Sequence, residues 1–259
     1  MSDEKSLKYN EPWILQRADP YVYRHTDGSY YFTASVPAYD GIVLRRAGTL
    51  AELSGAEEVM VWKKHESGPM SYHIWAPEIH YLFGKWYIYF AGGEAEDIWK
   101  IRPYVLECSG DDPLTDEWVE LGKMKRAAED EFSFEAFSLD ATVFENKGEY
   151  YYVWAEKVGV GKMISNLYIA KMESGNQLKT VQVLLTTPDY DWERKGFWVN
   201  EGPAVIHHDG KMFLTYSASE TGVDYCVGML SIDEDADILD PRLWKKERYP
   251  VLKTCEKLG

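Results

Sequence analysis

A repeated hairpin pattern constrains this chain more than any other feature. Each copy places a short apolar strand, a tight turn at glycine and an aromatic-rich strand in the same order. The four copies are Ala18–Phe32, Ala76–Phe90, Leu139–Trp154 and Glu201–Tyr216. Their turn glycines, Gly28, Gly84, Gly148 and Gly210, lie roughly 60 residues apart, a spacing that indicates a repeat architecture.

Each copy is predicted to continue into further strands. Third strands are expected at Gly41–Arg46, Tyr104–Cys108, Asn166–Met172 and Tyr225–Leu230, and weaker fourth strands at Glu58–Trp62 and Val181–Leu185. Continuous aromatic runs such as Trp86–Phe90 favour strands that are covered on both faces. Helix is expected only as single turns, at Thr49–Leu53 and Asp240–Leu243.

Three to four antiparallel strands per repeat are typical of β-propeller blades. The sequence therefore predicts an all-β fold, with one propeller domain over residues 1–259 and blades near 18–62, 75–122, 138–186 and 200–252. A fifth turn glycine would fall just beyond the end of the chain. About four blades and a short tail, Thr254–Gly259, are therefore encoded in this chain of the five-bladed propeller type.

The charge and the cysteines narrow the classes of function. A formal net charge of −15 disfavours nucleic acid and anionic membranes as partners, because both are negatively charged. The three cysteines, Cys108, Cys226 and Cys255, are an odd number without a CxxC pair, which argues against a disulfide framework and a zinc site. Residues 1–10 hold no apolar signal segment, so the chain as given is expected to be cytoplasmic.

Three carboxylates stand at similar places in the repeat. Asp19 lies nine residues before its turn glycine, Asp140 eight and Glu201 nine, while the second copy has Trp75 there. The first strands of propeller blades line the central axis, so these side chains are predicted to converge. Clustered carboxylates raise one another's pKa, the condition under which one acid and one base perform glycoside hydrolysis. Acidic residues at strand ends also satisfy turn amides, which is the alternative interpretation.

The strings Ala18-Asp19-Pro20, Trp75-Ala76-Pro77-Glu78, Ser138-Leu139-Asp140-Ala141 and Asn200-Glu201-Gly202-Pro203 resemble glycoside hydrolase family 43. The stretch ADPYVYRHTDGSYYFTASVPAYDGIVLRRAGTL is similar to its α-L-arabinofuranosidase members. The resemblance covers all four blades and implies an inverting enzyme on a five-bladed propeller. It makes Asp19 the general base, Glu201 the general acid, and Asp140 the carboxylate that orients the acid and holds its pKa up.

Trp75, Phe137 and Trp198 are the candidates for substrate contacts, since aromatic faces pack on sugars; the alternative is that their rings fill blade interfaces. Relatives also carry a fifth blade, with a His that contacts a central cation. That His has no counterpart that can be assigned in this sequence, so no metal ligand is named. No cofactor is expected to be required, and a central calcium or sodium ion is an open alternative. Open blade edges could be covered by self-association.

The expected function is release of terminal α-L-arabinofuranosyl residues from arabinan or arabinoxylan oligosaccharides. One alternative is a β-D-xylosidase of the same family, which would also act on xylose-containing oligosaccharides. Another is a non-catalytic carbohydrate-binding propeller or a truncated inactive one. Pocket walls would decide between exo and endo action, and the segments Pro37–Gly41 and Glu94–Arg102 are the candidates for such walls.

Overall fold

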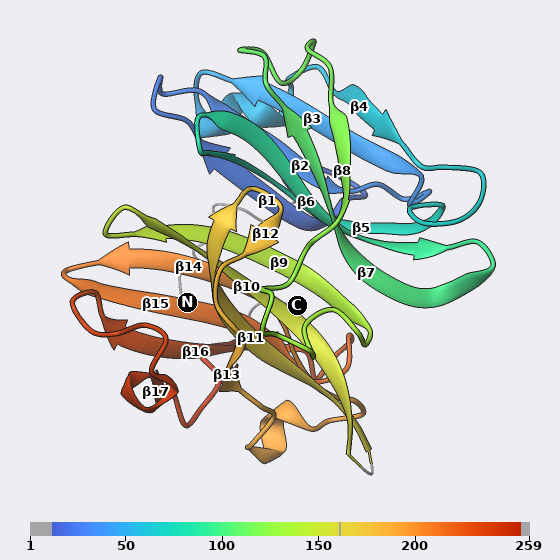
Figure 1. The fold of residues 1–259 in the computed structure, drawn as a ribbon. Coiled ribbons are helices and arrows are strands. Elements are labelled where there is room, and N and C mark those ends of the chain that lie inside the picture. The colour runs from blue at the N-terminus through green and yellow to red at the C-terminus, as the bar shows by residue number, and fades with distance from the viewer. Residues whose placement is uncertain (1–11, 161, 255–259) are drawn as a thin grey trace, which may run out of the picture.

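The computed structural model describes residues 12–160 and 162–254, and this part of the chain is almost entirely β-strand (Figure 1). The strands form four antiparallel units, numbered 1 to 4 in chain order. Unit 1 contains β1 (Ala18–Arg24), β2 (Tyr30–Ser35), β3 (Gly41–Ala47) and β4 (Val59–Lys63). Unit 2 contains β5 (Tyr72–Leu82), β6 (Lys85–Glu94), β7 (Asp97–Cys108) and β8 (Val119–Lys123).

Units 3 and 4 follow the same plan with extra short strands. Unit 3 contains β9 (Ser138–Asn146), β10 (Glu149–Val160), β11 (Lys162–Ser174), β12 (Gln177–Leu178) and β13 (Val183–Thr186). Unit 4 contains β14 (Trp198–His208), β15 (Lys211–Ala218), β16 (Cys226–Asp233), β17 (Lys245–Lys246) and β18 (Leu252–Lys253). The all-β prediction is confirmed.

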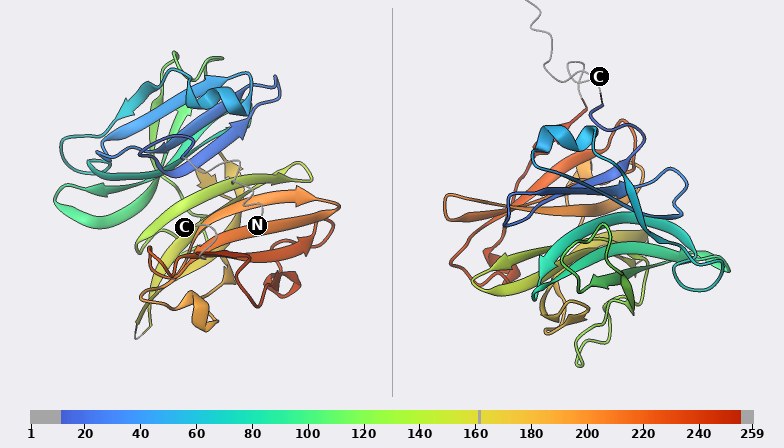
Figure 2. Two further views of the ribbon diagram at one scale, coloured as in Figure 1. Left: turned by 180° about the vertical axis from the view of Figure 1, so that it is seen from behind. Right: turned by 90° about the horizontal axis from the view of Figure 1, so that it is seen from above.

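Units 1 and 2 are separate four-stranded sheets, ordered β1-β2-β3-β4 and β5-β6-β7-β8. Units 3 and 4 are joined into one ten-stranded sheet, because β11 pairs in parallel with β14 at Ile164–Trp198 and Ser165–Val199. The repeat pattern did not predict this link. Figures 1 and 2 show units 1 and 2 on one side of the molecule and units 3 and 4 on the other. The first strands, β1, β5, β9 and β14, contact one another in succession.

Tight turns close three of the four first hairpins. Phe83-Gly84, Lys147-Gly148 and Asp209-Gly210 each have positive φ at both residues, as two-residue turns matched to strand twist require. Unit 1 differs, because Arg24 pairs with Tyr30 and leaves a longer loop, 25–29, between β1 and β2. This difference in loop length changes the residue count back from the turn glycine to the carboxylates.

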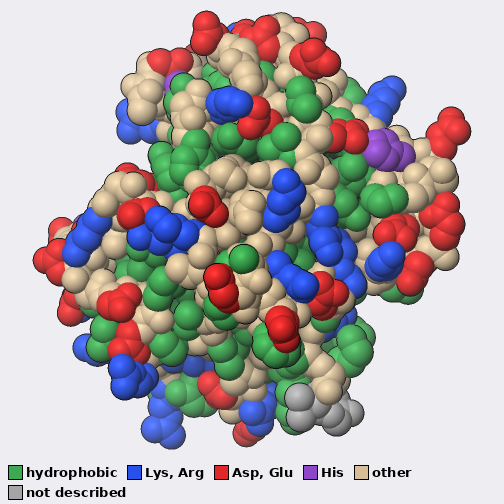
Figure 3. Space-filling model, in the orientation of Figure 1, with side chains coloured by type: hydrophobic (Ala, Val, Ile, Leu, Met, Phe, Trp, Pro, Cys, Tyr) green, Lys and Arg blue, Asp and Glu red, His purple; other side chains and the backbone are tan. Residues whose placement is uncertain are grey.

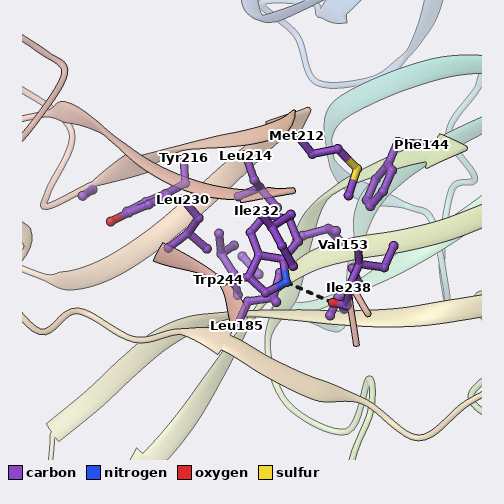
Figure 4. Close-up of a cluster of buried hydrophobic side chains, with 14 of the residues drawn as sticks. Phe144, Val153, Leu185, Met212, Leu214, Tyr216, Leu230, Ile232, Ile238 and Trp244 are labelled. Atoms are coloured by element: carbon purple, nitrogen blue, oxygen red, sulfur yellow. Dashed lines mark hydrogen bonds between the residues drawn. The ribbon is translucent and has the colours of Figure 1, made fainter. Parts of the chain in front are cut away.

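The core lies between successive units. On β6, Trp86, Ile88 and Phe90 are buried against unit 1, whereas Tyr87 and Tyr89 are buried against unit 3. Side chains alternate between the two faces of a strand, so a strand covered on both sides is apolar throughout. Between units 3 and 4 the buried cluster includes Trp244, whose indole N–H donates to the Ile238 carbonyl at 2.9 Å (Figure 4).

Three short 3₁₀ helices connect the strands. The turns predicted at Thr49–Leu53 and Asp240–Leu243 are found as η1 (Leu50–Ser54) and η3 (Pro241–Leu243), capped by Thr49 and Asp240. A third, η2 (Asp191–Glu193), was not predicted. Within residues 12–160 and 162–254, no helix is long and apolar enough to cross a membrane. Cys108 and Cys226 are buried free thiols, and Cys255 lies outside the described residues.

Candidate active site

The same backbone irregularity interrupts all four first strands. The pairing with the neighbouring strand shifts once in β1, β9 and β14 and twice in β5, and in each strand a residue with a left-handed backbone lies within a shift. These residues are Asp19 (φ 50°), Ala76 (φ 45°), Asp140 (φ 49°) and Gly202 (φ 56°). β-Bulges of this kind re-aim side chains and concentrate near active sites. The shared irregularity gives the true structural alignment of the four units.

This alignment corrects the expected equivalence of the three carboxylates. Asp19 and Asp140 occupy the bulge position, but unit 4 has Gly202 there and Glu201 precedes it by one residue. Unit 2 likewise has Ala76 in the bulge, and Trp75 corresponds to Glu201. Asp19 and Glu201 both lie nine residues before their turn glycines, so counting from the glycines made them look equivalent. The longer β1–β2 loop of unit 1 is the cause, because it adds to the count in that unit. Successive residues of a strand point to opposite sides, so Glu201 approaches the site from another direction than the two aspartates.

Asp19 is exposed, and a hydrogen-bond chain from unit 2 holds its carboxylate. The Ser35 hydroxyl donates to Asp19 Oδ2 at 2.7 Å, and the Ala76 N–H donates to the same Ser35 oxygen at 2.8 Å. The Ser35 oxygen accepts from the Ala76 N–H, and the Ser35 O–H donates to Asp19. This chain orients one oxygen of Asp19 and connects the bulges of units 1 and 2.

Asp140 is bound across the next unit boundary, where the Gly202 N–H donates to Asp140 Oδ2 at 3.1 Å. Desolvation raises the pKa of Asp140 well above its usual value, and the charges of Glu201 and Asp19 raise it further. Gly202 has φ +56°, and an added Cβ would meet Ser217 Oγ at 3.3 Å. A side chain at this position would therefore disturb the backbone that bonds Asp140.

Glu201 also has a raised pKa, caused first by desolvation and then by the charge of Asp19. Two groups act against this rise: the Tyr225 hydroxyl donates to Glu201 Oε1 at 2.9 Å, and the Lys157 ammonium attracts the carboxylate. The proximity of Glu201 in turn raises the pKa of Asp140. The three predicted carboxylates therefore lie near enough to influence one another electrostatically.

Two cavities receive these groups. The first, here called the carboxylate cavity, has a volume of about 370 Å³ and is lined by residues that include Asp19, Asp140, Glu78 and Tyr225. The second, here called the aromatic cavity, has a volume of about 440 Å³ and contains Glu201. The three predicted aromatic residues, Trp75, Phe137 and Trp198, all line the aromatic cavity.

Cations cover two of these rings. The Lys157 ammonium lies 3.8 Å from the centre of the Phe137 ring, and the Arg194 guanidinium lies 4.7 Å from that of Trp198. Contacts of this kind fix the orientation of an aromatic ring. Tyr225 lines the carboxylate cavity and donates to Glu201, which lines the aromatic cavity, so this hydrogen bond links the two cavities.

Glu78 is the third carboxylate that lines the carboxylate cavity, beside Asp19 and Asp140, and the repeat analysis did not select it. It lies two residues beyond the bulge of β5, on the same face, which is the signal that could have found it. Its carboxylate accepts from His80 Nε2 at 2.9 Å, while desolvation raises its pKa. Ser35, Tyr225 and Lys157 were missed as well, since nothing in their local sequence separates them from structural residues.

The implied central cation finds no set of ligands in the described part of the chain. No group of three or more His, Cys, Asp or Glu residues within 12–160 and 162–254 is arranged to hold a metal ion.

Comparisons with known proteins point to the same class of enzyme as the carboxylates of the site. The model of glycosyl hydrolases family 43 matches residues 9–258. An extracellular exo-α-(1→5)-L-arabinofuranosidase of Streptomyces avermitilis is 48% identical over 254 residues, which cover 98% of this chain and 52% of that protein. A protein of the same name from Streptomyces chartreusis is 47% identical over 243 residues, covering 94% of this chain and 72% of its own. The chain thus spans about half the length of the first relative.

A solved structure is similar over nearly the whole chain. The crystal structure of an α-L-arabinofuranosidase from Lactobacillus brevis superposes with a TM-score of 0.86 at 51% sequence identity, and covers 95% of this chain and 77% of that one. A thermostable family-43 glycoside hydrolase shares the fold at 23% identity, with a TM-score of 0.73.

The expected cytoplasmic location is wrong by this comparison, because the two Streptomyces relatives are named extracellular enzymes. Cys108 and Cys226 carry no contrary information, since both thiols are buried and buried thiols react little. The family model matches almost the entire length of this chain, and the two Streptomyces relatives are 48% and 47% identical to it. The chain therefore belongs to glycosyl hydrolases family 43.

Proposed function

We propose that this chain is an inverting, exo-acting glycosidase that removes terminal α-L-arabinofuranosyl residues from arabinan or arabinoxylan oligosaccharides. The observation that carries the proposal is the convergence of Asp19, Asp140 and Glu201, from three different units, on two adjacent cavities. Like charges in a desolvated place are costly, and glycoside hydrolysis makes use of them. The names of the relatives supply the sugar and the exo mode.

Asp19 is proposed as the general base. It takes a proton from a water molecule whose oxygen attacks the anomeric carbon, and the Ser35 hydroxyl orients its carboxylate by donating to Oδ2. Glu201 is proposed as the general acid, which gives its proton to the departing glycosidic oxygen as the bond to the anomeric carbon breaks. Attack and departure on opposite faces of the sugar invert the configuration.

Asp140 is proposed to hold up the pKa of Glu201 and to orient it. Its bond from the Gly202 N–H places it beside the backbone of the acid, and its own pKa is raised by the charge of Glu201. Carboxylates that repel one another in this way hold a proton more tightly, which is the condition for a general acid beside a general base. Trp75, Phe137 and Trp198 would contact the sugar from the aromatic cavity.

The four units are proposed to be blades of a five-bladed propeller. This assignment is supported by the succession of β1, β5, β9 and β14 and by the apolar cores between consecutive units. We propose blade boundaries near 18–62, 75–122, 138–186 and 200–252, which lie within three residues of the ends of units 1 to 4. In this arrangement the bulges of all four first strands face the central axis.

The test is hydrolysis of p-nitrophenyl α-L-arabinofuranoside and p-nitrophenyl β-D-xylopyranoside by the wild type, Glu201→Gln and Asp19→Asn. We expect the arabinoside to be preferred, and each variant to lose on the order of 10²–10⁴-fold in rate, the contribution of one general acid or base. Asp235→Asn, which changes a fully exposed carboxylate, is the matched control and should keep full activity. A preference for the xyloside would favour the β-D-xylosidase alternative. A folded wild type without turnover would favour a binding protein.

A further inference from the structure

A cluster of three aromatic rings reaches from the aromatic cavity to the surface of unit 2. The ring of His73 lies beside that of Trp75, with centres 4.2 Å apart and planes inclined by 33°. The ring of Trp99 contacts both, with its centre 5.2 Å from that of His73 and 6.3 Å from that of Trp75. Trp75 lines the cavity, whereas Trp99 is 61% exposed. The cluster therefore connects the cavity to solvent.

Ordinary core packing does not explain Trp99, because a side chain that is 61% exposed buries little of its surface. His73 contributes as a flat, neutral ring. Its Nε2 is buried and has no hydrogen-bond partner among the described residues, and desolvation lowers its pKa. The His73 ring contacts the rings of Trp75, Tyr72 and Trp99, at 4.2, 4.4 and 5.2 Å between centres.

The hairpin between β6 and β7 holds Trp99 in place. The Ala95 N–H donates to Ser71 Oγ at 2.7 Å, and the Ser71 N–H donates to the Gly93 carbonyl at 3.1 Å. A Cβ on Gly93 would meet the Ile98 carbonyl at 2.8 Å, so only glycine lets the two strands approach this closely. Preorganised aromatic side chains bind with less loss of conformational freedom.

We propose that Trp99 and His73 form, together with Trp75, a stacking platform for the sugar residues beyond the scissile bond. The ligand class is a neutral arabinofuranosyl oligosaccharide, whose apolar faces would lie on the rings as the chain leaves the cavity. On this hairpin Lys100 pairs with Glu94 at 2.9 Å, while Glu96 and Asp97 add negative charge. The excess of acidic residues disfavours an acidic oligosaccharide and is compatible with a neutral one. The inference rests on the proposed function and assigns its substrate-length preference to these residues.

The experiment compares kcat/KM for arabinobiose, arabinotriose and arabinotetraose, linear and α-(1→5)-linked, with kcat/KM for p-nitrophenyl α-L-arabinofuranoside. In the wild type we expect kcat/KM to rise with chain length. In Trp99→Ala the ratio of the tetraose value to the aryl glycoside value should fall about tenfold, the effect of losing one stacked ring. Trp99→Phe should keep most of the ratio, because it retains an aromatic face.

The matched control is Trp13→Ala, which removes another exposed tryptophan that packs edge-on against Phe32 and lines neither cavity. Its ratio should equal that of the wild type. An unchanged ratio in Trp99→Ala, or the same fall in both variants, would overturn the platform. If the wild type hydrolyses no substrate, the proposed function fails. Binding of arabinotetraose, followed by tryptophan fluorescence, then decides: affinity lost in Trp99→Ala supports the platform, and absent or equal binding overturns it.

Discussion

The pKa of Glu201 depends on a balance between desolvation and one hydrogen bond. Desolvation favours the neutral form of Glu201, while the Tyr225 hydroxyl, at 2.9 Å, favours the ionised form. A general acid works best when its pKa lies near the working pH, which requires such a balance. Tyr225 was predicted only as the first residue of a strand. Its role became visible when the fold brought its hydroxyl to Glu201.

Tyr225→Phe should therefore move the pH profile. Loss of the donor removes a bond that stabilises the carboxylate of Glu201, so its pKa rises. The acid then stays protonated to higher pH, and the alkaline limb of kcat/KM should shift upward by about 1 pH unit, as one charge-assisted hydrogen bond implies. The measurement is kcat/KM against pH for both proteins. Tyr249→Phe, at an exposed tyrosine, is the control; an unmoved limb in Tyr225→Phe would contradict the assignment.

At the scale of elements, the sequence predicted the strands better than their register. The paired turn residues and the aromatic runs located the hairpins, because local backbone and burial preferences act within a few residues. The register of the bulges depends on pairing across strands, and a loop of different length in unit 1 misaligned Asp19 with Glu201. Glu78 and Tyr225 depend on the same long-range pairing, so neither could be selected from local patterns.

The unpredicted helix η2 shows how one side chain can hold an element beside the site. Glu193 is fully buried and accepts from the Tyr216 hydroxyl at 2.9 Å, from Asn200 Nδ2 at 3.0 Å and from Lys246 Nζ. Asn200 precedes Glu201 directly on β14. Glu193 thus connects η2, β17 and the strand that carries the proposed acid.

Glu193→Gln should destabilise the fold strongly, because Lys246 loses its buried ionic partner and keeps only the half-exposed Asp189, at 3.3 Å. The expected loss in free energy of unfolding is about 3–5 kcal/mol, the usual cost of breaking a buried ion pair. Urea denaturation measures it, and Glu193→Gln combined with Lys246→Met should recover part of the loss. Lys147→Met, which breaks the exposed pair with Asp235, should change stability by less than about 1 kcal/mol. Equal losses in the buried and exposed pairs would refute the argument.

At the scale of the whole molecule, the repeat predicted the all-β class, and the comparisons assign the family. The parallel pairing of β11 with β14 was missed, since it joins units whose sequence patterns are independent. The net charge of −15 also does not predict where individual charged side chains lie. On the face in Figure 3, acidic and basic side chains are interspersed. Asp140 and Glu201 differ from these surface charges, because they are desolvated and lie near other carboxylates. Their repulsion lowers the stability of the fold.

Asp140→Asn should therefore stabilise the protein while it removes activity. The pKa of Asp140 is raised in the folded state, so folding is favoured where the proton is bound and loses stability as pH rises above the ordinary value. Asparagine keeps an oxygen to accept from the Gly202 N–H but carries no charge. At pH 7.5 we expect a gain of about 1–2 kcal/mol, or roughly 2–8 °C in Tm. Near pH 4 the gain should vanish, because Asp140 is then protonated in the wild type. A gain of equal size at both pH values would show that charge is not its cause, and Asp235→Asn should show no gain at either.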